Sequence, residues 1–224
     1  MNCTKETVDM QELLKRGMGE LLYDGEEGAV VRVNGGGTVI SDIADGNRLL
    51  GVLEELGLSE AEQIMVKDTE CYRTLREKYG FPELLPCSQW IYDRKEPPFV
   101  PDCDVRPLGE EYAQEAASHY HLVADSLAYI QARIAAGQMW GLFEDGKLAG
   151  FIGTHSEGAM GMLEIFPDYR RKGYGYALEA WLIAWHLKQG WTAYCHVIEG
   201  NESSVYLQEK LGLERCRLPA LWLS

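Results

Sequence analysis

Residues 163–176 bring together the side chains and glycines with the clearest chemical role in this sequence. An apolar run ends at Pro167, three cations occupy positions 170–172, and Gly173 and Gly175 open a helical pattern that continues to about Gln189. The first amides of a helix have no partner within the helix, and the helix dipole makes that end positive. Glycines let a ligand approach the main chain, and arginine and lysine add charge-assisted hydrogen bonds. The pattern therefore predicts a site for a ligand that carries phosphate groups.

This turn differs from the two most familiar phosphate-binding loops. It lacks the Gly-Lys-Ser/Thr of a loop that binds a triphosphate with a metal, and it lacks the third glycine of a dinucleotide-binding turn. The spacing Arg170-x-x-Gly173-x-Gly175 instead resembles the coenzyme A pyrophosphate motif of the GNAT acyltransferase superfamily. This resemblance extends over residues 101–224.

A second segment of the same half carries the resemblance further. Asn201 and Ser204, followed by Leu211-Gly212-Leu213, resemble the Asn-x-x-Ser/Ala…Leu-Gly-Phe segment of that superfamily. Asn201 is also a suitable N-cap for a helix, and the two roles are compatible.

The resemblance implies that acetyl-CoA or another acyl-CoA is the co-substrate. In this superfamily the fourth and fifth strands of the lobe separate, and the pantetheine arm lies between them and pairs with main-chain groups. The residues that this places at the coenzyme are Leu163, Ile165, Phe166, Arg170, Arg171, Lys172, Gly173, Tyr174, Gly175, Tyr176, Asn201, Ser204 and Gln208.

A closer likeness is to glycine N-acyltransferase-like proteins. It depends on the lead into the turn, Pro167-Asp168-Tyr169-Arg170, and on the strand Tyr194-Cys195-His196-Val197 before Asn201. It implies acyl transfer to an amino acid or a similar small amine.

Direct attack by an amine requires a base that takes a proton from the ammonium form. Three residues are candidates: His196 and Glu164, which rank together, and Glu157, which ranks third. Many relatives have a tyrosine seven residues after the asparagine as general acid, whereas this chain has Gln208 there. The alternative function is therefore a non-catalytic acyl-CoA-binding or regulatory module, and the alternative acceptor is a protein or peptide amine.

Composition limits the partners. The 224 residues carry a formal net charge of −14, with −9 in residues 1–103 and −5 in residues 104–224, so we expect no nucleic acid partner. No apolar stretch is long enough to cross a bilayer, and no secretory signal is visible. The six cysteines are scattered without a Cys-x-x-Cys pair, which predicts free thiols and no metal site. We expect a cytoplasmic monomer or homodimer with no membrane association.

The two halves of the chain have similar sequence segments, which predicts an internal repeat. The segment 75–81 matches 207–213 at an offset of 132 residues, and Ile64-Met65-Val66 falls on His196-Val197-Ile198 at the same offset. A proline-rich stretch at 96–101 separates the halves. We therefore predict an α/β (α+β) fold with two GNAT-like lobes, each a mixed sheet flanked by helices. Residues 1–100 would form a degenerate lobe, and 101–224 the catalytic, acyl-CoA-binding lobe.

The hydrophobic pattern predicts the individual elements. Helices are expected at 10–22, 46–57, 70–79, 110–120, 126–136, 173–189 and from 201 to Gly212. Strands are expected at 29–33, 38–40, 63–66, 88–92, 104–108, 139–143, 148–154, 159–166, 192–198 and 213–223. The three glycines at 35–37 are interpreted as a hairpin turn because a strand follows them.

Overall fold

Two compact units make up the fold, and each includes residues from both halves of the chain. The computed structural model describes residues 4–58, 61–122 and 125–224. The first unit comprises the described residues of Met1–Ile91 with Tyr194–Val205 and Glu214–Ser224, and the second comprises Tyr92–Ala193 with Tyr206–Leu213. The predicted division at residue 100 stays a prediction, and the structure adds that the last strands group with the first unit.

The first unit contains a mixed sheet in the order β1-β2-β3-β4-β11-β5-β10. Its strands are β1 (Gly19–Gly25), β2 (Gly28–Val33), β3 (Thr38–Ser41), β4 (Gln63–Val66), β5 (Leu84–Tyr92), β10 (Ala193–Ile198) and β11 (Glu214–Leu223). β2 and β3 pair antiparallel across the glycine turn, as predicted. β3 and β4 pair in parallel, because helix α2 (Gly46–Glu55) connects them.

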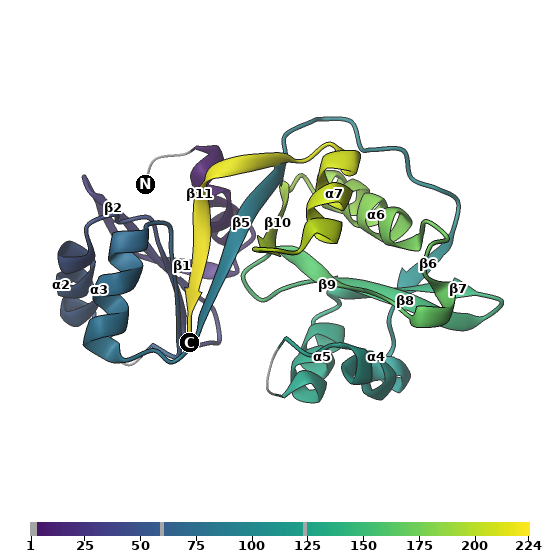
Figure 1. Cartoon of the computed structure of the whole chain (residues 1–224), viewed down its shortest axis with the longest axis horizontal. Coiled ribbons are helices and arrows are strands. Elements are labelled where there is room, and N and C mark those ends of the chain that lie inside the picture. Colours follow the sequence, from purple (N-terminus) through teal and green to yellow (C-terminus); the bar gives the residue numbers. More distant parts are fainter. Residues whose placement is uncertain (1–3, 59–60, 123–124) are drawn as a thin grey trace. The chain divides into compact units, whose positions relative to one another are not determined.

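Helices cover both faces of this sheet because side chains alternate along each strand. Met10 and Leu13 of α1 (Val8–Lys15) pack with Val31 and other residues of one face. α2 and α3 (Thr69–Tyr79) pack on the opposite face with Val30 and its neighbours. Figure 1 shows α2 and α3 side by side.

The segment order β4-α3-β5 recurs as β10-α7-β11, where α7 is Glu202–Leu211. β11 lies between β4 and β5 and pairs antiparallel with both. Its pairing with β5 is long-range in sequence, since Glu214 pairs with Ile91, and Figure 1 shows this yellow strand beside the blue β5. The last strand of the chain is therefore an internal strand of the first unit.

The second unit contains the antiparallel strands β9-β8-β7-β6 in that order. They are β6 (Asp104–Pro107), β7 (Met139–Glu144), β8 (Lys147–Thr154) and β9 (Met160–Ile165). α6 (Tyr174–Lys188) covers one face, and α4 (Ala113–His119) with α5 (Ser126–Ala135) covers the other (Figure 1). Trp181 and Trp185 of α6 pack against Trp140 of β7, with ring centroids 5.5 and 4.7 Å apart.

One predicted element is wrong. The helix expected over 10–22 ends at Lys15, and residues 19–25 form strand β1 instead. Gly17 adopts a left-handed φ of 67°, which ends the helix, and the chain then turns into the sheet. Pairing of β1 with β2 outweighs the helical spacing of Leu21 and Leu22.

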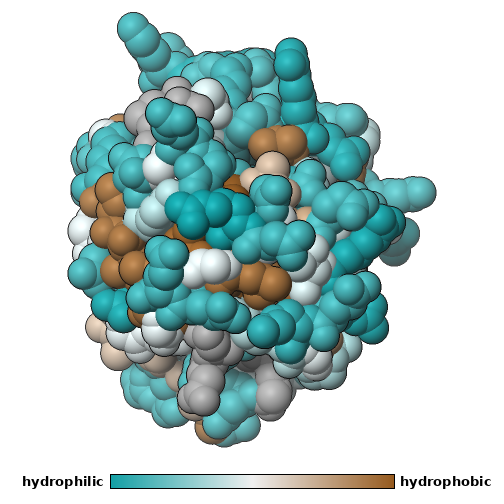
Figure 2. Space-filling model, turned by 90° about the vertical axis from the view of Figure 1, so that its left-hand side faces the viewer, coloured by the Kyte–Doolittle hydropathy of each residue, from teal (hydrophilic) through white to brown (hydrophobic). Residues whose placement is uncertain are grey.

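The surface of the molecule is mainly hydrophilic on the face that Figure 2 shows. Smaller hydrophobic areas lie between the hydrophilic residues. In the described part of the chain, no helix is long and apolar enough to cross a membrane. The five described cysteines are free thiols: Cys71, Cys87, Cys103, Cys195 and Cys216.

Candidate functional site

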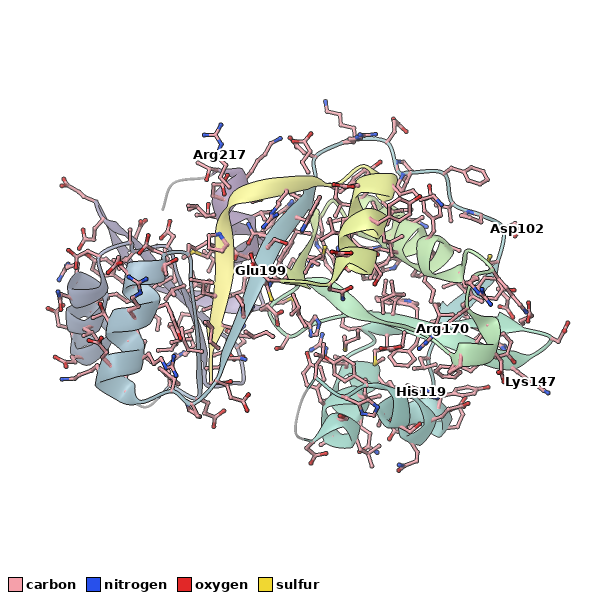
Figure 3. The ribbon with its side chains drawn as sticks, viewed as in Figure 1. Asp102, His119, Lys147, Arg170, Glu199 and Arg217 are labelled. Carbon is pink, nitrogen blue, oxygen red and sulfur yellow. The ribbon has the colours of Figure 1, made fainter. Side chains whose placement is uncertain are left out.

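The predicted phosphate turn joins β9 to α6 in the second unit. A short 3-10 helix at Pro167–Tyr169 follows β9, and Gly173 is the N-cap of α6 with φ 85° and ψ 5°. Nothing lies within 4 Å of where a Cβ at Gly173 would be, so its left-handed backbone is what favours glycine here. The Nε of Arg170 donates to the main-chain oxygen of Ile165 at 2.9 Å. This bond fastens the turn to the end of β9, and Figure 3 labels Arg170 on the turn.

The start of α6 presents main-chain amides that the helix does not use. The amide of Ala177 donates to the oxygen of Gly173 at 3.0 Å, so the N–H groups from Gly173 to Tyr176 precede the first bond of the helix. A Cβ on Gly175 would be 3.9–4.0 Å from atoms of Ile165, Leu163 and Leu207, which is ordinary contact. The protein itself therefore has room for a side chain at Gly175, and the glycine keeps that space open beside the amides.

One of the three predicted cations is already paired. The Nζ of Lys172 lies 2.7 Å from Glu144 Oε2, and the hydroxyl of Tyr174 donates to the other oxygen of the same carboxylate. The hydrogen bonds from Lys172 and Tyr174 lower the pKa of Glu144, and the bond to Glu144 raises the pKa of Tyr174 to about 12. Glu144 holds the turn against the β7–β8 hairpin. This contact could not be predicted from the sequence, because 28 residues separate Glu144 from Lys172.

The main chain of β9 has a bulge near its middle. Met162 has φ 55°, and the register of β8 with β9 shifts between Phe151 and Gly153. Such a bulge interrupts the ladder and redirects the backbone groups beside it. It lies next to Leu163, the first residue predicted to contact pantetheine.

The three residues of β9 and its end that were predicted to contact pantetheine differ in which of their main-chain groups are already hydrogen-bonded. The amide of Phe166 donates to Ala149 O at 3.0 Å, and its oxygen accepts from Tyr169. Since Gly150 pairs with Ile165, antiparallel alternation turns the main-chain groups of Ile165 and Leu163 toward the edge of β9 away from β8. The amide of Ile165 and the main-chain groups of Leu163 therefore point toward that edge, whereas the oxygen of Ile165 accepts from Arg170 and the amide of Phe166 is occupied.

Glu164 lies on the opposite face of β9 from Leu163 and Ile165. Its side chain is half-buried, and burial raises the pKa of its carboxyl, partly offset by the charges of Arg170, His119 and His121. His119 itself stacks on Phe166, with ring centroids 4.1 Å apart. Glu164 therefore lies on the α4 side of the sheet, with its pKa moved toward neutrality.

Glu157 lies in the β8–β9 turn and is buried. Tyr129 and His155 form a hydrogen-bonded pair nearby, with 2.7 Å between the hydroxyl and Nδ1. Burial raises the pKa of Tyr129, and the charge of Glu157 raises it further. Burial lowers the pKa of His155, which Glu157 partly offsets. This tyrosine–histidine pair could not be predicted from the sequence, since α5 and the turn meet only in the fold.

His196 belongs to the first unit, in a buried polar network. Its Nε2 lies 3.3 Å from Gln89 Oε1 and 3.9 Å from Asp9 Oδ2. The Nζ of Lys67 lies 2.5 Å from Asp9 Oδ2 and 2.7 Å from Gln89 Oε1. Lys67, Asp9 and Gln89 are all buried. The structure thus joins His196 to a lysine–aspartate pair that the sequence analysis did not identify.

The α7 residues have defined partners. The side-chain oxygen of Asn201 accepts from the amide of Ser204 at 3.1 Å, so Asn201 is the predicted N-cap. Gln208 is buried and hydrogen-bonds to Glu179 of α6. Gln208 thus faces the interior between α6 and α7.

Comparison with known proteins identifies the family. The model of the acetyltransferase (GNAT) family matches residues 91–213, which is more than half of the 224-residue chain. The chain belongs to the GNAT acetyltransferase family. Its members transfer an acetyl group from acetyl-CoA to an amine, so this chain is assigned to the acyltransferases. The phosphate turn and all of β6–β9 lie within the matched region.

Solved structures share the GNAT fold over nearly the whole chain. A Drosophila protein of 17% identity has a TM-score of 0.69 and covers 98% of this chain and 86% of its own. A protein described as a GNAT-family acetyltransferase from Novosphingobium aromaticivorans has 19% identity, a TM-score of 0.57 and coverage of 96% and 95%. A tandem GNAT protein from the clavulanic acid biosynthesis pathway has 15% identity, a TM-score of 0.50 and coverage of 97% and 87%. These likenesses confirm the predicted mixed α/β fold. No curated protein matches this chain significantly in sequence.

Proposed function

We propose that this GNAT protein transfers an acyl group, most simply acetyl, from acyl-CoA to the primary amine of a small molecule. The observation that carries the proposal is the start of α6. The start of α6 has unused amides and an open space at Gly175, and the cations Arg170 and Arg171 directly precede it in sequence. A diphosphate matches this arrangement in charge and in hydrogen-bonding capacity.

The edge of β9 supports a place for the pantetheine arm. The main-chain groups of Leu163 and the amide of Ile165 point to the side of β9 away from β8, so amide groups of the arm would pair with them as an added strand does. Glu144, through Lys172 and Tyr174, would hold the turn in position for the diphosphate.

The proposed reaction is direct attack. The neutral amine forms a C–N bond with the thioester carbonyl, and the tetrahedral oxyanion is stabilised by a main-chain amide of β9 beside the bulge. The C–S bond then breaks and coenzyme A leaves, while the ammonium proton passes to a carboxylate. We assign this base to Glu164, through water, because burial raises its pKa toward the working range. Glu157 and His196 remain the alternatives that variants must separate.

The proposed arrangement has two lobes, a degenerate one in residues 1–100 and the acyl-CoA-binding one in 101–224. The repeated order β4-α3-β5 and β10-α7-β11 supports a duplication, and one structural neighbour is described as a tandem GNAT protein. The likeness of residues 167–170 and 194–197 to glycine N-acyltransferase-like proteins supports an amino acid or similar amine as acceptor.

One observation favours a second function, an acyl-CoA-binding module without turnover. Gln208 occupies the position where many relatives have a tyrosine acid, and it is buried against Glu179. An amide has no proton to give to a leaving thiolate.

The decisive experiment measures thiol release from acetyl-CoA with a panel of amino acids and other small amines, beside coenzyme A binding by calorimetry. Catalysis requires amine-dependent thiol release, reduced at least about a hundred-fold in kcat by Glu164→Gln, the scale of general-base loss. Binding without release on any amine supports the binding module. No binding at all contradicts both functions. Gly175→Val, with its bulk in the open space, should abolish binding in either case.

A further inference from the structure

His155 has a fixed position in the turn between β8 and β9. Its amide donates to the oxygen of Ala159 at 2.8 Å. Its Nδ1 lies 2.7 Å from the hydroxyl of Tyr129 in α5. α5 is itself joined to the end of β8, since the Nε of Arg133 donates to the oxygen of Thr154 at 2.9 Å. The half-buried imidazole is therefore held on the α5 side of the sheet with a defined orientation.

The hydrogen bonds of Tyr129 determine which nitrogen of His155 carries the proton. Burial raises the pKa of Tyr129, so its hydroxyl is protonated at neutral pH, and a main-chain hydrogen bond from Ser156 acts in the opposite direction. The Ser156 amide is thus a donor to the hydroxyl oxygen, and within the described residues Nδ1 of His155 is the acceptor left for the hydroxyl proton. Burial lowers the pKa of His155, which favours the neutral ring. A neutral imidazole whose Nδ1 accepts carries its proton on Nε2.

Nε2 of His155 lies over the main chain of β9 beside the bulge. A Cβ added to Gly161 would be 2.4 Å from Nε2 and 2.7 Å from Cδ2, so this edge of the ring fills the space of a side chain at position 161. Gly161 directly precedes Met162, the residue of the bulge with φ 55°. In the part of the chain that the structure describes, Nε2 has no hydrogen-bond partner. An N–H donor without a partner therefore lies next to the bulge.

The proposed reaction develops negative charge at the same place. It puts the thioester carbonyl beside the bulge, where a main-chain amide of β9 donates to the carbonyl oxygen. A donor that the protein already holds in place stabilises the oxyanion of the transition state more than the neutral carbonyl of the substrate. A neutral imidazole N–H is suited to this role, because it polarises a carbonyl without giving up its proton.

We propose that His155 is a second hydrogen-bond donor to the oxyanion, through Nε2–H, and that Tyr129 is the residue that positions it. The inference rests on the proposed function, which places the thioester at the bulge. As the amine forms the C–N bond, the π electrons of the carbonyl move to its oxygen, which accepts from Nε2–H and from the main-chain amide. When the C–S bond breaks, the carbonyl forms again and both donors keep their protons. The base is still Glu164, since His155 takes no proton.

Thiol release from acetyl-CoA, with the amine that supports turnover, tests the donor. His155→Ala should lower kcat about a hundred-fold, the scale of losing one oxyanion donor. Its calorimetric affinity for coenzyme A should stay within about two-fold of the wild type, because free coenzyme A has no acyl carbonyl. His155→Gln keeps an N–H donor on a side chain of similar length and should recover part of the lost kcat.

The role of Tyr129 is tested by a variant and by the tautomer. Tyr129→Phe should lower kcat about ten-fold, the scale of one hydrogen bond. Tyr112→Phe is the matched control, because this ring packs against Phe143 and its hydroxyl has no hydrogen-bond partner among the described residues. Nitrogen NMR of labelled histidine should show the His155 proton on Nε2 in the wild type and in Tyr112→Phe, and on both nitrogens in Tyr129→Phe.

Gly161→Ala displaces the imidazole without changing it. Its methyl group would occupy the place of Nε2, and the ring, as the end of a side chain, can move aside while the strand stays folded. The variant should lower kcat about ten-fold or more through misplacement of the donor. It also keeps the inference testable if His155→Ala does not fold, which melting temperatures will establish.

The outcomes separate this inference from the proposed function. A wild type without amine-dependent thiol release overturns both. Turnover in His155→Ala or Gly161→Ala within about two-fold of the wild type overturns this inference alone, and so does a wild-type imidazole with its proton on Nδ1. A loss of coenzyme A affinity in His155→Ala that matches the loss of kcat also overturns it, because the residue would then support the binding site as a whole.

Discussion

Glu179 of α6 and Gln208 of α7 are hydrogen-bonded partners in the interior of the second unit. Burial raises the pKa of Glu179 to about 7, although the bond from Gln208 lowers it. Within the described residues, Glu179 Oε2 and Gln208 Oε1 are buried and have no hydrogen-bond partner. Burial therefore favours the neutral acid of Glu179 more strongly than the bond from Gln208 favours its carboxylate.

The first prediction is a pH-dependent stability that Glu179 controls. Its pKa is raised from 4.5 to about 7, so its contribution to stability is fully present below pH 4.5 and is lost as pH rises through 7. Glu179→Gln should be more stable than the wild type above pH 7, by about 3 kcal/mol at most, and similar at pH 4.5. Urea unfolding at several pH values measures this, and parallel curves for the two proteins would contradict it.

The two glycines of the turn should respond differently to alanine. Gly173 has φ 85°, so Gly173→Ala should cost about 1 kcal/mol of stability. Gly175 begins a helix and has ordinary space for a Cβ, so Gly175→Ala should be neutral or stabilising by up to about 1 kcal/mol. Thermal unfolding without ligand tests both.

The alanine substitution at Gly175 should affect coenzyme binding differently from stability. Gly175→Ala should weaken coenzyme A binding although it does not destabilise the fold, because its methyl group enters the space beside the free amides. Unchanged affinity in calorimetry would show that the ligand does not approach the main chain there. Gly190→Ala, at a glycine that follows the far end of α6 with φ 76°, is the control for the strain of a left-handed glycine without a ligand role.

The last strand should be required for the first unit. β11 pairs with both β4 and β5, so deletion of residues 214–224 removes one hydrogen-bonded neighbour from each of these two strands. We expect the shortened chain to lose hydrogen-exchange protection in β4 and β5. For the same reason, residues 101–224 produced alone should not form a stable β11. Full protection of β4 in the shortened protein would contradict this.

The buried hydrogen-bond network of Asp9, Lys67, Gln89 and His196 should contribute to the stability of the first unit. Lys67→Met leaves the carboxylate of Asp9 buried without its partner at 2.5 Å and should cost about 3–5 kcal/mol. The double variant Asp9→Asn with Lys67→Met should recover part of that loss. Chemical unfolding of the three proteins measures the coupling, and additive effects of the two substitutions would contradict it.

A variant of His196 separates the two roles considered for this residue. If its imidazole serves the network, His196→Gln should lower stability together with activity, and activity measured on the folded fraction should remain close to that of the wild type. Loss of kcat at unchanged stability would instead assign the base to His196.

Residues that are close together in the sequence determined most of the helices and strands, and also the phosphate turn at residues 170–175. The alternation of Val30, Val31 and Val33, the glycines at 35–37 and the helix-ending Gly80 each act through neighbouring residues, so the sequence alone predicted β2, β3 and the end of α3. Arg170, Gly173 and Gly175 form a site through consecutive main-chain atoms, and their spacing was sufficient to predict it.

Only the tertiary structure decided which distant residues meet. The pairing of Lys172 with Glu144, of Gln208 with Glu179, and of β11 with β4 depends on how separate elements pack. Helix and strand periodicity specify which face of an element is buried, but they carry no information about its partner across the core. Residues 19–25 became a strand for the same reason, since pairing with β2 is a non-local gain that outweighs local helical spacing.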